Sequence, residues 1–462
     1  MNAKNTVTFD SALPIFAEIL LSRMGRCVLD EGTFLRDVSG RLTFVLSDDR
    51  WNDAIESVSR LVSEQLHGYV DGPDHAISTP ARLFDDSLRT REGAISKRIV
   101  LPATEGKATI WIVDRRGVGQ DWLMQPAAQS QLLPLVVFAS IKGGVGRTTA
   151  LCVLAAHLAS SGKRVLAVDM DFEAPGLGTM LLTPETQPEF GLLDYIVESA
   201  IGGPPSKMII DSIGPSWLGG GRGRIDVVPV VGSRSAMNPE NVLSKIARAY
   251  LVSGDENGGG LSGVLSSFLS EATSDLRYDV VLVDARAGLH ETTASAILGL
   301  GGEVFLFGVN QPQTLLGFDF LLSHIAERTS RADAFWSRLH FVQAKSAMDD
   351  VEANYQGSIE NLLRTRLFAT KDVQPDLEGL ASNFDVEWGD FASIDTGNEV
   401  SDFIDSLSFV SIPETEAYRS FDPLISPDLL SPTKYFLPYA AFIEEVGAII
   451  EDYQVLRMRD VP

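Results

Sequence analysis

The fold is decided by the stretch LVVFASIKGGVGRTT, residues 135–149. Its first part is a short apolar run without alternation, which predicts a strand buried on both faces of a parallel sheet. Residues 150–159 have the apolar spacing of a helix. The glycines between them therefore lie at a turn from strand to helix.

A turn of this kind can hold a phosphate group. Glycine permits the φ values that the turn needs, and without Cβ atoms the backbone N–H groups can converge on phosphate oxygens at the positive end of the helix. The hydroxyl of Thr148 would then face a Mg²⁺ ion. The general pattern GxxxxGK[ST] is not met, because Ile141 stands at its first glycine and Arg147 replaces its lysine.

KGGVGRTT instead closely resembles the deviant Walker A motif KGGxGK[ST]T of the MinD/ParA group of P-loop ATPases, in the SIMIBI class. The arginine marks a variant set with the motif KGGVGR. The resemblance implies an α/β fold with a mostly parallel sheet flanked by helices, and ATP and Mg²⁺ as ligands. A chance glycine-rich turn is the alternative. The nucleotide-binding residues that the motif implies are Gly143, Gly144, Val145, Gly146, Arg147, Thr148 and Thr149.

Two further buried strands end in acids. Residues 164–171 place Asp169 and Asp171 at the carboxyl end of a strand, where a parallel sheet presents function. By the resemblance, Asp169 would help to organise the Mg²⁺ shell and Asp171 would position the attacking water. Two acids that merely end a strand are the alternative.

Residues 278–284 resemble a Walker B strand. Asp284 would hold Mg²⁺ through water, together with Thr148 and Asp169, and Gly288 in the following loop could offer its N–H to a γ-phosphate. Arg286 could clamp phosphate or reach a neighbouring subunit, and a structural salt bridge is an equal alternative.

The base-binding end is less well marked. Residues 339–345 resemble the strand that ends in a base-reading asparagine in the MinD/ParA group, and Gln343 takes that position here. Residues 409–413 could form a further strand whose following loop, at Pro413, edges the base.

The resemblance also implies a mechanism. In the group, two subunits sandwich two ATP molecules, and the early lysine reaches the partner's phosphates; here it is Lys142. The expected catalytic residues are thus Lys142, Arg147 and Asp171. Arginine keeps the positive charge but has a larger, planar head, so nucleotide binding should survive and the hydrolysis rate is left open.

Three functions are considered. The first is an ATP-dependent homodimer that acts as a switch for an unidentified protein partner, with slow, partner-stimulated ATPase activity. The second is an ATP-gated scaffold or interaction protein with little or no hydrolysis. The third is a ParA-like ATPase that positions DNA. The net charge of −24, from 62 acidic and 38 basic residues, opposes a general DNA- or anionic-membrane-binding surface.

The length of 462 residues predicts two domains or more. Residues 1–130 read as a small α+β domain of unknown role that could bind a partner. Residues 131–462 read as the ATPase domain, with an acidic C-terminal part. Residues 125–130 are expected to form the linker.

The expected location is the cytoplasm. The chain contains two cysteines, which indicates a reducing compartment. Its start lacks a basic segment followed by an apolar core, and no run approaches the roughly 20 apolar residues of a membrane span. The six histidines show no metal-ligand spacing.

Overall fold

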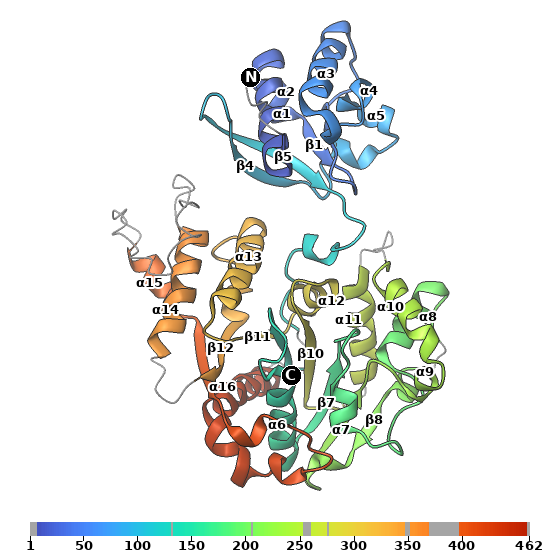
Figure 1. Cartoon of the computed structure of the whole chain (residues 1–462), viewed down its shortest axis with the longest axis vertical. Helices are drawn as coiled ribbons and strands as arrows, with labels where there is room; N and C mark the ends of the chain where they lie inside the picture. Colours follow the sequence, from blue (N-terminus) through green and yellow to red (C-terminus); the bar gives the residue numbers. More distant parts are fainter. Residues whose placement is uncertain are drawn as a thin grey trace. The chain divides into compact units, whose positions relative to one another are not determined.

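A computed structural model shows two compact units, Met1–Leu123 and Met124–Pro462 (Figure 1). They are called the N-terminal and the C-terminal unit below. The structure describes residues 7–130, 133–204, 207–252, 260–274, 277–346, 352–368 and 397–459. Residues 347–351, 369–396 and 460–462, which belong to the predicted acidic C-terminal part, lie outside these ranges.

The N-terminal unit is an α+β domain with a mixed sheet in the order β3-β2-β1-β5-β4. Its strands are β1 (Thr33–Arg36), β2 (Leu42–Val45), β3 (Ile77–Ser78), β4 (Ile95–Val100) and β5 (Lys107–Asp114). Its helices are α1 (Phe9–Met24), α2 (Arg26–Glu31), α3 (Asp53–Leu66), α4 (Pro73–Ala76) and α5 (Pro80–Leu83). Phe16, Phe34 and Phe44 are fully buried, and edge-to-face ring contacts with centroids 5.3 and 5.0 Å apart join them.

Arginines of this unit make intramolecular contacts. Arg89 forms ion pairs with Asp49 and Asp86. Arg91 donates to the backbone carbonyls of residues 30–32 and lies over the ring of Trp111. Both arginines therefore have partners within the N-terminal unit.

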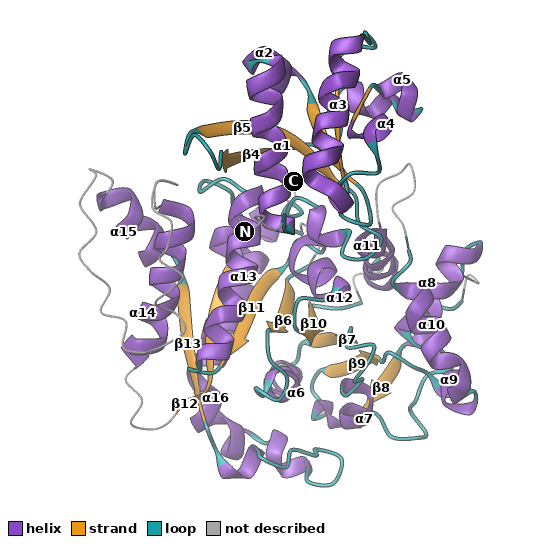
Figure 2. Cartoon of the chain, turned by 45° about the horizontal axis from the view of Figure 1, so that its top comes forward, coloured by secondary structure: helices purple, strands orange, loops and turns teal. Residues whose placement is uncertain are grey.

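The C-terminal unit contains an eight-stranded sheet in the order β13-β12-β11-β6-β10-β7-β9-β8 (Figure 2). All neighbours pair in parallel except β8 and β9. The strands are β6 (Leu135–Ser140), β7 (Arg164–Asp169), β8 (Gly214–Ser216), β9 (Arg224–Val228), β10 (Val280–Ala287), β11 (Glu303–Gly308), β12 (Leu339–Ser346) and β13 (Ser408–Pro413). The predicted fold class, a mostly parallel sheet flanked by helices, is confirmed.

Helices cover both faces of this sheet. On one face, α6 (Arg147–Ser160) and α16 (Pro432–Arg459) pack on alternate strand residues, including Phe138 and Phe307. The other face carries α12 (Glu291–Ala294), α13 (Pro312–Arg328) and α14 (Glu352–Leu363). Every residue of β6 is buried, which is why the apolar run there does not alternate with polar residues.

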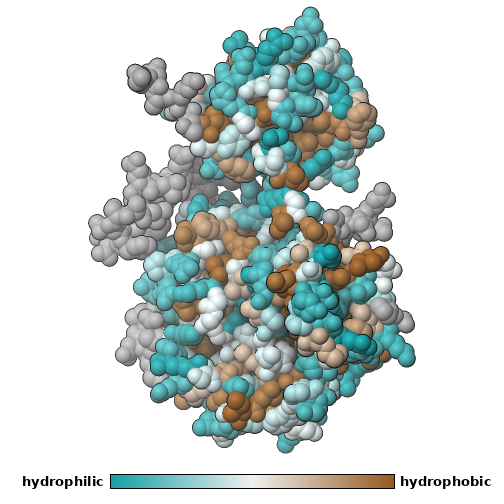
Figure 3. All heavy atoms as spheres, turned by 45° about the vertical axis from the view of Figure 1, so that its right-hand side comes forward, coloured by the Kyte–Doolittle hydropathy of each residue, from teal (hydrophilic) through white to brown (hydrophobic). Residues whose placement is uncertain are grey.

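The remaining helices of the C-terminal unit connect or flank the strands. They are α7 (Leu177–Leu181), α8 (Leu192–Ile201), α9 (Ser233–Met237), α10 (Val242–Ala249), α11 (Gly260–Thr273) and α15 (Gly397–Asp405). Figure 3 shows brown, apolar areas among hydrophilic side chains on the visible face of this unit. Within the described ranges, no helix has the length and apolarity that a membrane crossing needs.

Residues 125–130, expected as a linker, are hydrogen bonded to the C-terminal unit. The N–H of Ala127 donates to the carbonyl of Leu298 at 2.7 Å, and the N–H of Ser130 donates to the carbonyl of Gly301 at 2.8 Å. Arg338, which is buried, donates to the carbonyl of Ala127 at 2.7 Å. This segment is therefore an ordered part of the C-terminal unit.

Candidate nucleotide site

A pocket of about 680 Å³ opens at the carboxyl ends of the parallel strands. Its floor is the turn between β6 and α6, and its far side is the loop after β13. The residues that line it include Ser140, Gly143, Gly144, Val145, Gly146, Arg147, Thr148, Thr149, Asp171, Lys345, Pro413, Glu414, Thr415, Tyr418 and Arg419. This volume is within the range of small-molecule sites.

The glycine turn has the geometry of an anion cradle. Gly144 has φ +72° and Gly146 has φ +90°, values that side chains with a Cβ rarely adopt. A Cβ added at Gly143, Gly144 or Gly146 would meet nothing within 4 Å, so the backbone faces open space. Gly146 caps the N-terminus of the 14-residue helix α6, whose dipole favours negative charge. The turn therefore fits a phosphate group.

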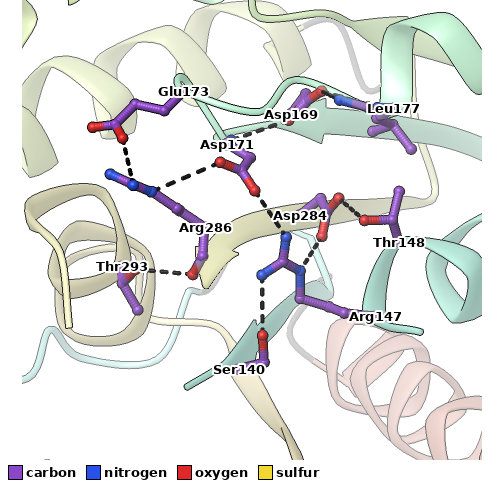
Figure 4. A network of polar contacts seen from close by, with 11 residues as sticks. Ser140, Arg147, Thr148, Asp169, Asp171, Glu173, Leu177, Asp284, Arg286 and Thr293 are labelled. Atoms are coloured by element: carbon purple, nitrogen blue, oxygen red, sulfur yellow. Dashed lines mark hydrogen bonds and ion pairs between the residues drawn. The ribbon is translucent and has the colours of Figure 1, made fainter. Parts of the chain in front are cut away.

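Arg147, the first residue of α6, points into a group of carboxylates (Figure 4). Its Nε donates to Asp284 Oδ1 at 2.6 Å, its Nη1 to Ser140 Oγ at 3.2 Å and its Nη2 to Asp171 Oδ2 at 3.3 Å. Only 8% of its side chain is exposed. The arginine thus joins the ends of three neighbouring strands.

Thr148 and Asp284 lie together at the start of α6 and in β10. The Thr148 hydroxyl donates to Asp284 Oδ2 at 2.6 Å. Asp284 is 2% exposed and pairs in register with Asp169 of β7. The parallel register explains why acids far apart in the sequence reach one edge of the sheet.

Asp169 accepts hydrogen bonds from the backbone of the loop that follows β7. Its carboxylate accepts the N–H groups of Asp171 at 3.0 Å, Gly176 at 3.1 Å and Leu177 at 3.0 Å. The side chain is fully buried. In this arrangement its oxygens hold the loop from Asp171 to Leu177.

The electrostatics of the site follow from burial. Burial, and next the charge of Asp284, raise the pKa of Asp169 to about 7, although hydrogen bonds from the backbone oppose this. Burial also raises the pKa of Asp171, against the effect of Arg147. Burial lowers the pKa of Arg147, but the charges of Asp284 and Asp171 outweigh it and raise this pKa above its ordinary value. Arg147 therefore stays charged.

Arg286, near the carboxyl end of β10, contacts the loop after β7. It forms an ion pair with Glu173, and its Nε lies 3.9 Å from Asp171 Oδ1. Glu173 also accepts the hydroxyl of Tyr250 at 3.2 Å, and the Tyr250 ring lies against that of His290. Of the roles considered for Arg286, the structure shows a salt bridge; Tyr250 and His290 were not predicted and carry no motif.

The other predicted residues lie as follows. Lys142 Nζ donates to Gln311 Oε1 at 3.0 Å. The N–H of Gly288 donates to the carbonyl of Ser140 at 2.8 Å. Gln343 is 3% exposed within β12 and is not among the residues that line the pocket, whereas Pro413 is. Lys345, two residues beyond Gln343 on the same strand, lines the pocket instead.

The oxygen donors suit a magnesium ion held partly by a ligand. Among the described residues, no group of three or more His, Cys, Asp or Glu side chains could hold a metal ion by itself. Mg²⁺ usually takes one or two protein ligands and completes its shell with water and phosphate oxygens. Thr148 Oγ1 and Asp284, 2.6 Å apart, fit that requirement.

Comparison with known proteins places the same region in a family. Residues 136–304 match the family described as the CobQ/CobB/MinD/ParA nucleotide binding domain. No curated protein sequence matches the chain.

Several solved structures resemble the chain. A ParA family ATPase from Chlorobium tepidum TLS is 16% identical, with 67% of this chain and 98% of that chain covered and a TM-score of 0.38. The cell division ATPase MinD of Pyrococcus furiosus is 17% identical, with 68% and 99% covered and a TM-score of 0.39. The septum site-determining protein MinD of Pyrococcus horikoshii OT3, complexed with Mg-ADP, is 21% identical, with 46% and 70% covered and a TM-score of 0.31.

The family match covers the strand, glycine turn and helix of the cradle, together with both acid-bearing strands. This part of the C-terminal unit is therefore similar to the CobQ/CobB/MinD/ParA nucleotide binding domain.

Proposed function

We propose that the chain binds ATP with Mg²⁺ and acts as a nucleotide-controlled dimerising switch for a protein partner, with slow ATP hydrolysis. The observation that carries the proposal is the pocket of about 680 Å³, which has the glycine turn at one end and Asp171 on its wall. The N-terminal unit is proposed to bind the partner, because it adds a separate core to the nucleotide-binding unit.

The roles proposed for the residues follow from their places. The N–H groups of residues 143–149 bind the phosphates, and Thr148 with Asp284 supplies oxygen atoms for the metal. Asp169 orders the loop that carries Asp171. Asp171, on the pocket wall, orients the attacking water. Mg²⁺, when bound, neutralises charge on the phosphates.

The base is proposed to lie toward the loop after β13. Pro413, Thr415 and Tyr418 line that end of the pocket with Lys345. The assignment of adenine contact to Gln343 is weakened by its burial in β12. Lys142 is proposed to leave Gln311 and reach the phosphates of a second copy when the dimer forms.

One observation favours the alternative, an ATP-gated scaffold with little or no hydrolysis. Arg147 pairs with Asp171 and Asp284, the two acids on which water activation and metal binding would depend. If the arginine kept these partners with nucleotide bound, the chain would hold ATP without turning it over. Binding of DNA is not proposed, because the net charge is −24.

Phosphate release by the purified chain separates the two functions. The switch predicts release from ATP that needs Mg²⁺ and falls to background in Asp171→Ala. Asp279→Ala, an acid at the opposite end of β10, is the matched control and should keep the wild-type rate. Equal rates in wild type and Asp171→Ala, in a protein that binds ATP, would favour the scaffold.

Size measured with and without ATP and Mg²⁺ tests dimerisation. Wild type should double its mass with nucleotide, and Lys142→Ala should remain a monomer. Lys207→Ala, an exposed lysine, is the control and should dimerise. A mass that changes neither with nucleotide nor with Lys142→Ala would contradict the sandwich arrangement.

A further inference from the structure

One oxygen of Asp171 is left without a hydrogen bond. Asp171 Oδ2 accepts Arg147 Nη2 at 3.3 Å, whereas Asp171 Oδ1 is buried and accepts no hydrogen bond from the residues that the structure describes. A buried carboxylate oxygen without a donor destabilises the fold, so such an atom is expected to take a water molecule or a ligand group. Because Asp171 lies on the pocket wall, Oδ1 is its atom that is left to accept from the attacking water.

Arg286 lies beside this oxygen, on an irregular part of β10. The register of β10 against β6 shifts between Asp284 and Ala287, which marks a bulge. A bulge changes the direction of the side chains next to it and is common beside active sites. From this place Arg286 Nε comes to 3.9 Å from Asp171 Oδ1 (Figure 4).

Arg286 is held at two points. Its Nη2 forms an ion pair with Glu173 Oε2 in the loop after β7. Its backbone carbonyl accepts the hydroxyl of Thr293 at 3.0 Å. Glu173 is held in turn, because its Oε1 accepts the hydroxyl of Tyr250 at 3.2 Å. Both the head and the backbone of Arg286 are therefore fixed.

Tyr250, which follows α10, adds ring contacts to the same group. Its ring stacks on that of Phe172 with centroids 6.2 Å apart, and Phe172 is 1% exposed. Its ring also lies against that of His290, with centroids 4.4 Å apart. Tyr250 thus contacts both the loop that carries Asp171 and the loop after β10.

We propose that Arg286 is a positioning residue for Asp171. Together with Glu173 and Tyr250 it keeps the loop after β7 in one place, so that Asp171 Oδ1 receives the attacking water at a constant position. Arg286 is not among the residues that line the pocket, so it acts through Asp171 and not on the nucleotide. This inference rests on the proposed function, because it names a residue on which hydrolysis at that site depends.

Steady-state phosphate release by the full chain tests the inference. Arg286→Gln and Glu173→Gln should each lower kcat at least about tenfold, because a displacement of about 1 Å at a reacting group can lower a rate about 100-fold. The KM for ATP should stay close to that of wild type, since neither side chain lines the pocket. Arg286→Lys keeps the charge and should recover part of kcat. Arg164→Gln, from a partly exposed pair with Asp279, is the matched control and should keep the wild-type kcat.

Binding of a transition-state analogue separates positioning from a general loss of structure. ADP with aluminium fluoride and Mg²⁺ imitates the phosphoryl group during transfer, and such analogues bind more tightly than ground-state ligands. Wild type should bind ADP more tightly with aluminium fluoride than without it. Arg286→Gln should lose at least about tenfold of that gain, yet its Kd for ADP alone should match that of wild type.

Two results would overturn the inference while wild type is active. One is an Arg286→Gln protein that is folded by circular dichroism and keeps the wild-type kcat. The other is an Arg286→Gln protein whose affinity for ADP falls by the same factor as its kcat, which would show a structural role alone. A wild type that binds ATP and releases no phosphate would instead contradict the proposed hydrolysis, and the inference with it. If Arg286→Gln does not fold, Glu173→Gln and Arg286→Lys decide the test.

Discussion

Arg147 is the residue in which this site departs most from the common lysine motif. Substitution of Arg147 or of its partners should destabilise the fold, because removal of one partner of a buried ion pair leaves the other charge without compensation. Asp284 accepts from both Arg147 and Thr148 and is 2% exposed. Both stability and metal-dependent nucleotide binding therefore depend on this one carboxylate.

Asp284→Asn should lower the free energy of unfolding of the C-terminal unit by about 3 kcal/mol, the usual cost of breaking a buried pair. It should also remove the effect of Mg²⁺ on nucleotide affinity. Urea unfolding and a nucleotide titration measure the two effects. Asp279→Asn breaks the more exposed pair with Arg164 and should cost less than about 1 kcal/mol. Equal losses in the two variants would contradict the prediction.

Asp169 predicts a dependence of stability on pH. Its pKa is raised to about 7 in the folded chain, mainly by burial, whereas an unfolded aspartate titrates near about 3.9. Between these values the folded state binds more protons than the unfolded state, so stability falls as the pH rises. The loss from Asp169 should reach up to about 1.4 kcal/mol per pH unit and should level off above about pH 7.

Comparison with Asp169→Asn isolates this effect. Two partly buried histidines act in the opposite direction, because partial burial lowers the pKa of His157 and of His290. We therefore expect the free energy of unfolding of wild type, measured with urea from about pH 5 to about pH 8, to fall relative to that of Asp169→Asn as the pH rises. Hydrogen bonding to Arg164 lowers the pKa of Asp279, so this carboxyl does not titrate in that range. The free energy of unfolding of Asp279→Asn should therefore change with pH as that of wild type does. Parallel curves for wild type and Asp169→Asn would rule the prediction out.

At the scale of elements, the sequence predicts the sheet well because burial leaves a clear pattern. The runs that became β6, β7 and β10 are mainly apolar, with polar residues near their ends, and helices cover both faces of them. Side-chain direction was not predictable in the same way. Arg147 faces Asp284 because parallel register brings β6 and β10 together, and Gln343 is buried because of its place in β12.

Glu173, in the loop after β7, forms an ion pair with Arg286, near the carboxyl end of β10. Both side chains are partly exposed, so the pair should add less than about 1 kcal/mol to global stability. Its effect should be local. Arg286→Gln and Glu173→Gln should each speed amide hydrogen exchange in residues 171–177. The double variant should exchange little faster than either single variant. Additive effects of the two changes would show that the ion pair does not couple the loops.

At the scale of the whole molecule, the N-terminal and C-terminal units have separate hydrophobic cores. Phe16, Phe34 and Phe44 belong to the core of the N-terminal unit, whereas Phe138 and Phe442 belong to the core that packs α6 and α16 on the large sheet. Separate cores of this size can unfold separately. The ligand, if bound as proposed, contacts residues of the C-terminal unit alone.

Calorimetry of the full chain should therefore show two transitions, of which ADP with Mg²⁺ raises one. Binding to the folded state alone stabilises by about 2.7 kcal/mol at a ligand concentration of about 100 times the Kd. Phe34→Ala removes a fully buried ring and should cost about 3–5 kcal/mol, which lowers or abolishes the other transition. The nucleotide-sensitive transition of Phe34→Ala should keep its midpoint and its response to ADP. A single transition that both Phe34→Ala and ADP shift would mean that the two cores unfold as one.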